Sequence, residues 1–527
     1  MRRVLALGET RMKRVITFIS ILLGGTGSEV SAQFLLGQTG SNYAGIHGIY
    51  ANPASAVDSR YKVHVHLAGY ENYLYNNYLA WEAPYSPVAM LTNTVSSKYR
   101  GPSKGIIFRD QEYLREKLNG RDKHLRAGGE VRGPGVLITL NEKNAFSFNT
   151  RIRAGVAVTH ASQSVAQLIK NGTTIGRAIE PEDFGTHVYA NTNGMVELSG
   201  SYARVMYDED EDFVKVGVTV KRVIGLHQGH ILGRNIDYEY VQDPTYATEA
   251  AVRLKSVDAQ YGITNEGALQ SVSFSPVWLL GNAPAGSGWG ADLGMVYEYR
   301  PDVRKYSYRD RYGVHRDASK NKYLYRISVS LLDIGRILYK NPNYVEAYKL
   351  QRRDAILAED NFTGMQGIDG FMLGLNQTLN PSESERIASY RTALPTRLQA
   401  SIDYNVKEKI YVNAMLMQGF VSNKRAAFTM PSVLAVTPRY EGKWVEVAMP
   451  VALTDNYSRL ALGLGARLGI LYFGSDNLLS TLNIGNPKGI EFYFGAQIPI
   501  YQKAPESNLK CYPQREKRGL FGFLKKK

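Results

Sequence analysis

The stretch that decides the fold reads "GWGADLGMVYEYRP" and covers residues 288–301. Its large apolar side chains recur at every second position, which is the period of a β-strand. The apolar row is Trp289, Ala291, Leu293, Met295, Tyr297 and Tyr299, and the opposite row is Gly290, Asp292, Gly294 and Glu298, with Val296 as the one exception. Aromatic rings at both ends of an apolar row are typical of outer-membrane strands, so this stretch predicts a transmembrane strand.

The same alternation returns along most of the chain. Phe146 and Phe148 share one face of a segment whose other face carries Arg151 and Arg153. A soluble sandwich also alternates, but Arg, Asp, Gly and Asn on the opposite faces favour a membrane barrel. We therefore predict an all-β fold, a transmembrane antiparallel β-barrel of about 14 strands within 61–501. The expected strands are 61–82, 134–140, 145–160, 195–207, 213–226, 266–280, 289–299, 322–338, 394–405, 410–420, 430–440, 443–454, 459–473 and 489–501.

The first 32 residues predict a signal peptide. Met12 is followed by Lys13 and Arg14, then by an apolar run over 15–23, and Val30-Ser31-Ala32 has the small-x-small pattern of a cleavage site before Gln33. The apolar run is about half of the ~20 residues that a membrane-spanning helix needs, which disfavours an anchor. We therefore expect an exported protein in the outer membrane of a Gram-negative bacterium.

Cysteine content and charge agree with a bacterial envelope. The one cysteine, Cys511, cannot form an intramolecular disulfide. The formal net charge is +15, and the leader and the tail from residue 503 onward carry much of it. An exported basic protein meets anionic lipid and lipopolysaccharide before nucleic acid, so we expect outer-membrane lipid and lipopolysaccharide as partners and no nucleic acid.

Several motifs resemble an uncharacterised family of outer-membrane barrels in Bacteroidota that is distantly similar to the FadL-like barrels, the fatty-acid transporter type. The motifs are "NPAS" (52–55), "GWGADLGMVYEYRP" (288–301), "SLLDIG" (330–335), "ALPTRLQASIDY" (393–404), "TPRYEGKWVEVAMPVAL" (437–453) and "ARLGILYFGSDNLLS" (466–480). The resemblance implies a barrel whose N-terminal segment, 33–60, folds into the lumen as a hatch or plug. Asn52, Pro53 and Ala54 would form the corner of that hatch, because Asn-Pro fits neither a helix interior nor a central strand. Whether the corner belongs to a moving gate or to a fixed plug stays open.

Charged and histidine side chains on the faces opposite the apolar rows are expected to point into the lumen. His64 and His66 are two residues apart and can share a metal ion, but the sequence offers no third ligand, so we predict no metal site and no cofactor. The chain also lacks the usual catalytic motifs, which predicts that it is not an enzyme. The candidate lumen-facing residues are His64, His66, Arg151, Arg153, Asp292, Asp403 and Arg467.

Two segments do not fit a plain barrel. The basic tail, 502–527, carries Leu520, Phe521, Phe523 and Leu524 beside lysines, and these four are candidate contacts to a periplasmic partner. With turns 141–144, 208–212 and 455–458 on the periplasmic side, segment 339–393 also becomes periplasmic, unless one strand is miscounted. Both features favour an accessory or scaffold subunit of a protein-export or barrel-assembly complex, with other outer-membrane barrels, lipoproteins or periplasmic proteins as partners. The alternative is a FadL-like passive transporter of hydrophobic small molecules.

Overall fold

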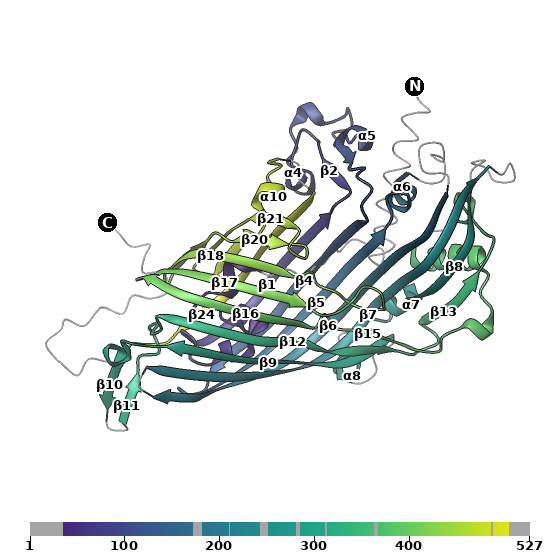
Figure 1. The fold of residues 1–527 in the computed structure, drawn as a ribbon. Coiled ribbons are helices and arrows are strands. Elements are labelled where there is room, and N and C mark those ends of the chain that lie inside the picture. Colours follow the sequence, from purple (N-terminus) through teal and green to yellow (C-terminus); the bar gives the residue numbers. More distant parts are fainter. Residues whose placement is uncertain are drawn as a thin grey trace.

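The computed structural model describes residues 35–171, 182–209, 211–242, 251–273, 275–280, 285–310, 313–362, 367–485 and 488–504. Within them the chain forms a closed antiparallel barrel of 14 strands, which confirms the predicted fold class (Figure 1). The last wall strand pairs with the first, so the barrel closes. The wall strands are β1 (Tyr61–Asn76), β4 (Lys123–Thr139), β5 (Asn144–Ala161), β6 (Glu182–Glu209), β7 (Asp212–Val241), β9 (Gly286–Tyr299), β12 (Tyr325–Tyr339), β16 (Arg397–Lys407), β17 (Ile410–Gly419), β18 (Val433–Glu441), β19 with β20 (Val445–Ala448 and Val451–Thr454), β21 with β22 (Arg459–Leu462 and Leu464–Leu468), β23 (Leu471–Ser475) and β24 (Gly489–Tyr501).

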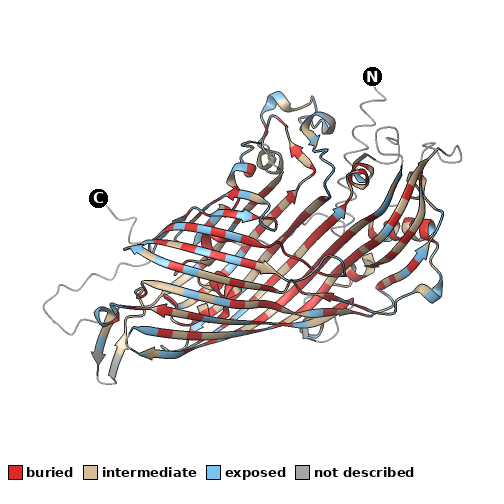
Figure 2. Ribbon diagram, in the orientation of Figure 1, coloured by how far each residue is buried: buried red, intermediate tan, exposed pale blue. Residues whose placement is uncertain are grey.

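Burial is inverted relative to a soluble protein. Trp289 is 62% exposed and Leu460 is 65% exposed, whereas the arginine Arg153 is 1% exposed. Figure 2 shows buried and exposed residues alternating along the wall strands. A barrel with apolar side chains outside and charged ones inside is the outer-membrane type. Within the described residues, no helix is long and apolar enough to cross a membrane.

Two of the predicted strands are wrong. Residues 266–280 form α7 (Glu266–Gln270) and α8 (Pro276–Leu280) instead of a wall strand. Asn265 caps α7, since its side chain accepts a hydrogen bond from the backbone N–H of Ala268. Pro276 is the first residue of α8. Segment 459–473 holds two strands, because Gly469 has φ +59° and turns the chain between β22 and β23. One strand lost and one gained leave the total unchanged.

These two errors also reverse part of the predicted sidedness. One end of the barrel, the short-turn end, holds Tyr61, Tyr501 and the turns before β5, β7, β17, β19 and β23. We call the opposite end the long-loop end. Turn 455–458 lies at the long-loop end, not with turn 141–144. Segment 339–393 also lies at the long-loop end, so the miscount explains it and the predicted periplasmic insertion is wrong.

The wall extends beyond the barrel at the long-loop end. The second half of β7 pairs with β8 (Ala251–Thr264), which pairs with β13 (Val345–Arg352) and β14 (Ala355–Ala358). Apolar side chains of α9 (Gly367–Leu379) and α6 (Gln163–Asn171) join those of this extension in one cluster. The other elements here are β2 (Leu79–Trp81), α4 (Pro87–Leu91), η2 (Ser97–Tyr99), α5 (Asp110–Tyr113), β3 (Leu114–Glu116), η5 (Glu359–Phe362), η6 (Glu383–Glu385), β15 (Tyr390–Ala393) and α10 (Leu478–Thr481).

Two further groups of elements occupy the short-turn end and the interior. At the short-turn end, η4 (Val303–Tyr306) leads into the hairpin of β10 (Ser307–Asp310) and β11 (Gly313–Arg316). The N-terminal segment, described from Leu35, forms α2 (Leu36–Thr39), α3 (Ile46–Ala51) and η1 (Pro53–Ala56) before β1 begins. The predicted signal peptide and the tail from residue 505 lie outside the described residues.

Candidate functional site

The N-terminal segment docks on the inner wall through its Asn-Pro-Ala corner. Gly217 of β7 and Gly294 of β9 lie opposite each other in register, and a Cβ atom on either would collide with the corner. The Asn52 amide donates to Ser328 Oγ at 2.8 Å and to the carbonyl oxygens of Met295 and Val329 at 3.0 and 3.1 Å. The facing glycines therefore form a notch in the wall that receives the corner.

Contacts on other sides of the barrel hold the rest of the segment. The backbone N–H of Leu36 donates to Asp476 Oδ2 at 2.9 Å, after β23, and that of Asn42 donates to Glu441 Oε1 at 3.1 Å on β18. Because the contacted strands lie around the whole circumference, the segment crosses and fills the interior at this level.

Apolar side chains of the segment pack against the wall and leave little open space. Ile46 and Ile49 join Leu137 and Phe213 in one buried cluster, so they do not line an apolar pocket. Two cavities beside the segment measure about 50 and 20 Å³, and the larger of the two has room for roughly three water molecules at about 15 Å³ each. A third cavity, of about 200 Å³, lies at the short-turn end and is lined by Asp58, Ser59 and Arg300. The segment therefore fills much of the short-turn half of the lumen.

A network of ion pairs lines one side of the lumen at mid-height, from β1 through β4–β7, β9 and β12 to β16, and we call it the central network. It contains five cations and five carboxylates, so its formal charges cancel. Tyr50 of the segment lies over the guanidinium groups of Arg132 and Arg151, at 4.8 and 4.7 Å from the ring centroid. The members are Arg132, Arg151, Arg153, Lys221, Arg397, Glu71, Glu130, Glu197, Asp292 and Asp333.

Asp333 is the hub of the central network. It lies in a β-bulge of β12, where the register to β9 slips between Leu331 and Ile334, and it has φ +55°. The bulge turns its carboxylate inward, where Arg397 Nη1 approaches to 2.6 Å and Arg153 Nη1 to 3.3 Å, with Lys221 as a further partner. One inserted residue thus places an anion among several cations.

The structure places the predicted lumen-facing residues inside the wall, in separate groups. Arg151, Arg153 and Asp292 belong to the central network. Asp403 pairs with Arg439 at 2.6 Å, and Arg467 pairs with Glu446 at 3.2 Å, both nearer the short-turn end. His64 faces Gln497 at 3.0 Å, and His66 faces the Tyr472 hydroxyl at 3.0 Å. Across the described residues no group of three or more His, Cys, Asp and Glu side chains is placed to hold a metal ion. Leu520, Phe521, Phe523 and Leu524 lie outside the described residues.

Most members of the central network were not predicted from the sequence. Glu130, Glu197 and Lys221 alternate with apolar residues just as Arg151 does, and the face opposite the apolar row would have found them. Asp333 gives a different signal. An aspartate directly after Leu331 and Leu332 breaks the strand period, which is the mark of a bulge.

The wall has a fork near the long-loop end. Strand β7 pairs with β9 up to Gly225 and with β8 from Gly229 onward, so no strand pairs with 226–228 on that side. The Thr264 hydroxyl replaces one of the missing strand contacts, since it accepts a hydrogen bond from the backbone N–H of Gln228 at 3.1 Å. This gap between β8 and β9 is what we call the fork.

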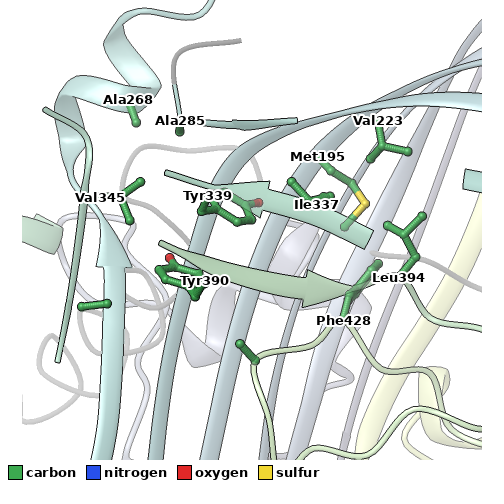
Figure 3. Packing of buried hydrophobic residues seen from close by; sticks show 12 residues of the cluster. Met195, Val223, Ala268, Ala285, Ile337, Tyr339, Val345, Tyr390, Leu394 and Phe428 are labelled. Carbon is green, nitrogen blue, oxygen red and sulfur yellow. The ribbon is translucent and has the colours of Figure 1, made fainter. Parts of the chain in front are cut away.

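Apolar side chains close the fork from the inside. Figure 3 shows the rings of Tyr339 and Tyr390 beside one another, with Ile337, Met195 and Val223 nearby. The two rings stack at 5.4 Å between centroids, and both hydroxyls are buried without a hydrogen-bond partner among the described residues. The inner lining of the fork is thus largely apolar, and the polar side chains His227 and Thr264 lie at its gap, 2.9 Å apart.

Helix α8 covers the fork from the outside. Trp278 is buried against Val196 and Ile224, which lie on the outer face of β6 and β7, while its neighbour Val277 is 70% exposed. Arg222 and Trp289, in register on that outer face, make a cation–π contact at 5.4 Å. Tryptophan and arginine are typical of the membrane interface, so the fork lies at that level.

A family model describes most of the chain. It is the model of a family of unknown function (DUF5723), and it matches residues 53–476. The chain belongs to this family. The match begins at Pro53 of the corner and ends at Asp476, so it includes both the central network and the fork. No curated protein matches the chain.

Solved structures show a distant resemblance to FadL-type barrels. A Pseudomonas aeruginosa FadL homologue is 9% identical with a TM-score of 0.31, over 90% of this chain and 100% of that one. The Pseudomonas putida toluene transporter TodX is 8% identical with a TM-score of 0.30, over 91% and 96%. The translocator domain of the Neisseria meningitidis autotransporter NalP is 8% identical with a TM-score of 0.29, over 88% and 98%.

Proposed function

We propose that this protein is a passive outer-membrane transporter of hydrophobic small molecules, and that these leave the barrel sideways through the fork. The observation that carries the proposal is the largely apolar lining of the fork above a charged lumen that the N-terminal segment partly fills. An apolar solute gains by contact with apolar side chains, whereas passage through the central network requires it to displace paired charges. The N-terminal segment acts as a fixed plug in this scheme.

The long-loop end offers an apolar approach to the fork. Ile236, Tyr261, Leu350 and Met372 belong to a large buried cluster between the sheet extension and α9. Ala268 of α7 and Val345 of β13 continue the apolar surface to Tyr339. With the long-loop end outside the cell, as is usual for such barrels, a solute meets apolar side chains from the surface to the membrane interface.

The scaffold hypothesis has less support. It relied on the basic tail, which lies outside the described residues, and on a periplasmic insertion at 339–393. That segment instead builds the apolar approach at the long-loop end. Nothing else among the described residues favours a scaffold over a transporter.

The test compares two probes in liposomes that contain the purified protein. An apolar aromatic dye is expected to pass at least about tenfold faster than in empty liposomes, and a monosaccharide is expected not to pass. Trp278→Ala, which uncovers the fork, is expected to raise dye flux several-fold. Val277→Ala is the matched control, because this neighbouring side chain points away from the wall, and it should leave the flux unchanged.

Two outcomes would contradict the proposal. Faster passage of the monosaccharide than of the dye indicates an aqueous pore. Equal dye flux in the Trp278→Ala and Val277→Ala variants, both well folded, shows that the fork is not the exit.

A further inference from the structure

The lumen near the short-turn end contains more buried positive than negative charge. The cavity of about 50 Å³ lies between the end of the N-terminal segment and the wall. Four cationic side chains and two carboxylates line it, which leaves an excess of two positive charges. They are Arg60, Lys215, Lys322, Arg326, Asp58 and Glu298.

The two lysines are held mainly by carbonyl oxygens. Lys215 Nζ donates to the carbonyl oxygen of Val57 at 3.0 Å, and its nearest carboxylate, Glu298, is 3.7 Å away. Lys322 Nζ lies 3.2 Å from Asp58 Oδ1 and also 3.2 Å from the carbonyl oxygen of Asp317. Carbonyl dipoles satisfy the donors, but they do not cancel the charges.

Neighbouring ion pairs do not remove the excess. Arg300 pairs with Asp58 at 2.6 Å and with Glu298 at 2.5 Å, so it competes for the same two carboxylates. Arg326 pairs with Asp403 at 3.0 Å, but Asp403 is shared with Arg439. With Arg300, Arg439, Asp403 and Glu441 included, there are six cations and four carboxylates, and the excess is still two.

An uncompensated buried charge is costly, so a protein either neutralises the group or supplies a counter-ion. Burial lowers the pKa of Lys322 to about 8, and Arg60 and Arg300 act in the same direction while Asp58 opposes them. The cavity has room for a group of roughly three water molecules' volume, at about 15 Å³ each. That size suits a small inorganic oxyanion.

We propose that this cavity binds a small inorganic oxyanion of the phosphate type between Lys215 of the wall, Lys322 of the loop before β12 and Arg60 of the N-terminal segment. The anion joins the plug to the wall, and it neutralises the excess charge. We call this place the anion cavity. The proposal goes beyond transport and holds whether or not the barrel passes hydrophobic solutes.

The experiment measures thermal unfolding of the full chain in detergent while inorganic phosphate is added at constant ionic strength. Gluconate replaces chloride in the buffer, because the cavity is too small for it. Phosphate at ten to a hundred times its dissociation constant is expected to raise the Tm of the wild type by several degrees. Lys215→Gln should lose most of that rise.

Lys221→Gln is the matched control. Lys221 lies on the same strand and also faces the lumen, but it belongs to the balanced central network, where Asp292 is 2.7 Å away. This variant should keep the phosphate-dependent rise even though its starting Tm is lower. In phosphate-free buffer, Lys215→Gln should cost less stability than Lys221→Gln, since it removes part of an excess charge.

Phosphate also strengthens folded proteins in general because it is excluded from their surfaces. An equal rise of Tm in the wild type and in Lys215→Gln is therefore the general salt effect only, and it overturns the proposal. Where Lys215→Gln does not fold, Lys322→Gln takes its place with the same expectation. A wild-type Tm that does not change with phosphate also overturns the proposal.

Discussion

The central network and the anion cavity are built from the same side-chain types and differ in charge balance. The central network pairs five cations with five carboxylates, whereas the anion cavity has four cations and two carboxylates. Paired buried charges are already satisfied and can only lock the wall and plug together. A surplus of one sign leaves a place for a ligand, so charge balance separates a structural network from a binding site.

The largest expected effect comes from unbalancing the central network. Asp333→Asn leaves Arg153, Lys221 and Arg397 without their shared carboxylate, and removing one member of a buried pair costs about 3–5 kcal/mol. Unfolding in denaturant should show this loss. Asp302→Asn, at a side chain 58% exposed, is the control and should change stability by less than about 0.5 kcal/mol. A loss below about 1 kcal/mol for Asp333→Asn would contradict the role of Asp333 as hub.

The N-terminal segment contacts both regions, through Tyr50 and through Arg60, and loosening it is expected to have an intermediate effect. Gly294→Val places a side chain where Asn52 and Pro53 now lie, and overpacking of this kind costs about 1–3 kcal/mol. Limited proteolysis should cleave the N-terminal segment about ten times faster or more. Gly200→Val is the control, because nothing lies within 4 Å of a Cβ at that position. Equal cleavage of both variants would show that the notch does not hold the corner.

The smallest effect is a pH dependence that Lys322 of the anion cavity should contribute. Burial lowers the pKa of Lys322 to about 8 in the folded protein, against 10.5 ordinarily. Between pH 8 and 10.5 the unfolded chain binds more protons at this group, so the free energy of unfolding rises with pH as the cost of its buried charge is removed.

Loss of that charge also weakens binding of an anion, so the phosphate-dependent rise of Tm should shrink about twofold or more from pH 7 to pH 9. The charged groups that face Lys322 are Asp58, Arg60, Glu298 and Arg300. The same titration with Lys322→Gln should show little pH dependence. A rise of Tm that grows with pH in the wild type would contradict the assignment.

Much of the barrel can be predicted from the sequence, because its side chains obey a strict period of two. Trp289 and Asp292 fall on opposite faces as the alternation requires, and Arg151 and Arg153 point inward. The errors arise where local geometry interrupts that period. Gly469 turns the chain inside an apparently continuous strand, and Asn265 and Pro276 begin helices within an apolar run.

The fork, the anion cavity and the notch cannot be predicted from the alternation of apolar and polar residues. The fork exists because β7 changes partner between Gly225 and Gly229, and pairing between distant strands leaves no local signal. The surplus charge of the anion cavity becomes visible only when Arg60, Lys215 and Lys322 are brought together from three places in the chain. The notch needs Gly217 and Gly294 in register, which alternation alone does not give.

The central claim is that apolar solutes leave through the fork while the plug stays in place, and a locked plug tests this most directly. A Cβ at Gly40 lies 3.2 Å from Asn413 Cγ, near the position that a cysteine sulfur would take, so Gly40→Cys with Asn413→Cys suits a disulfide between plug and wall. Cys511→Ser removes the native thiol. The measurement is flux of the apolar dye into liposomes before and after oxidation. We expect the dye flux before and after oxidation to agree within about twofold. A collapse of dye flux on oxidation that reduction restores would contradict this, because it would show passage through the lumen past a moving plug.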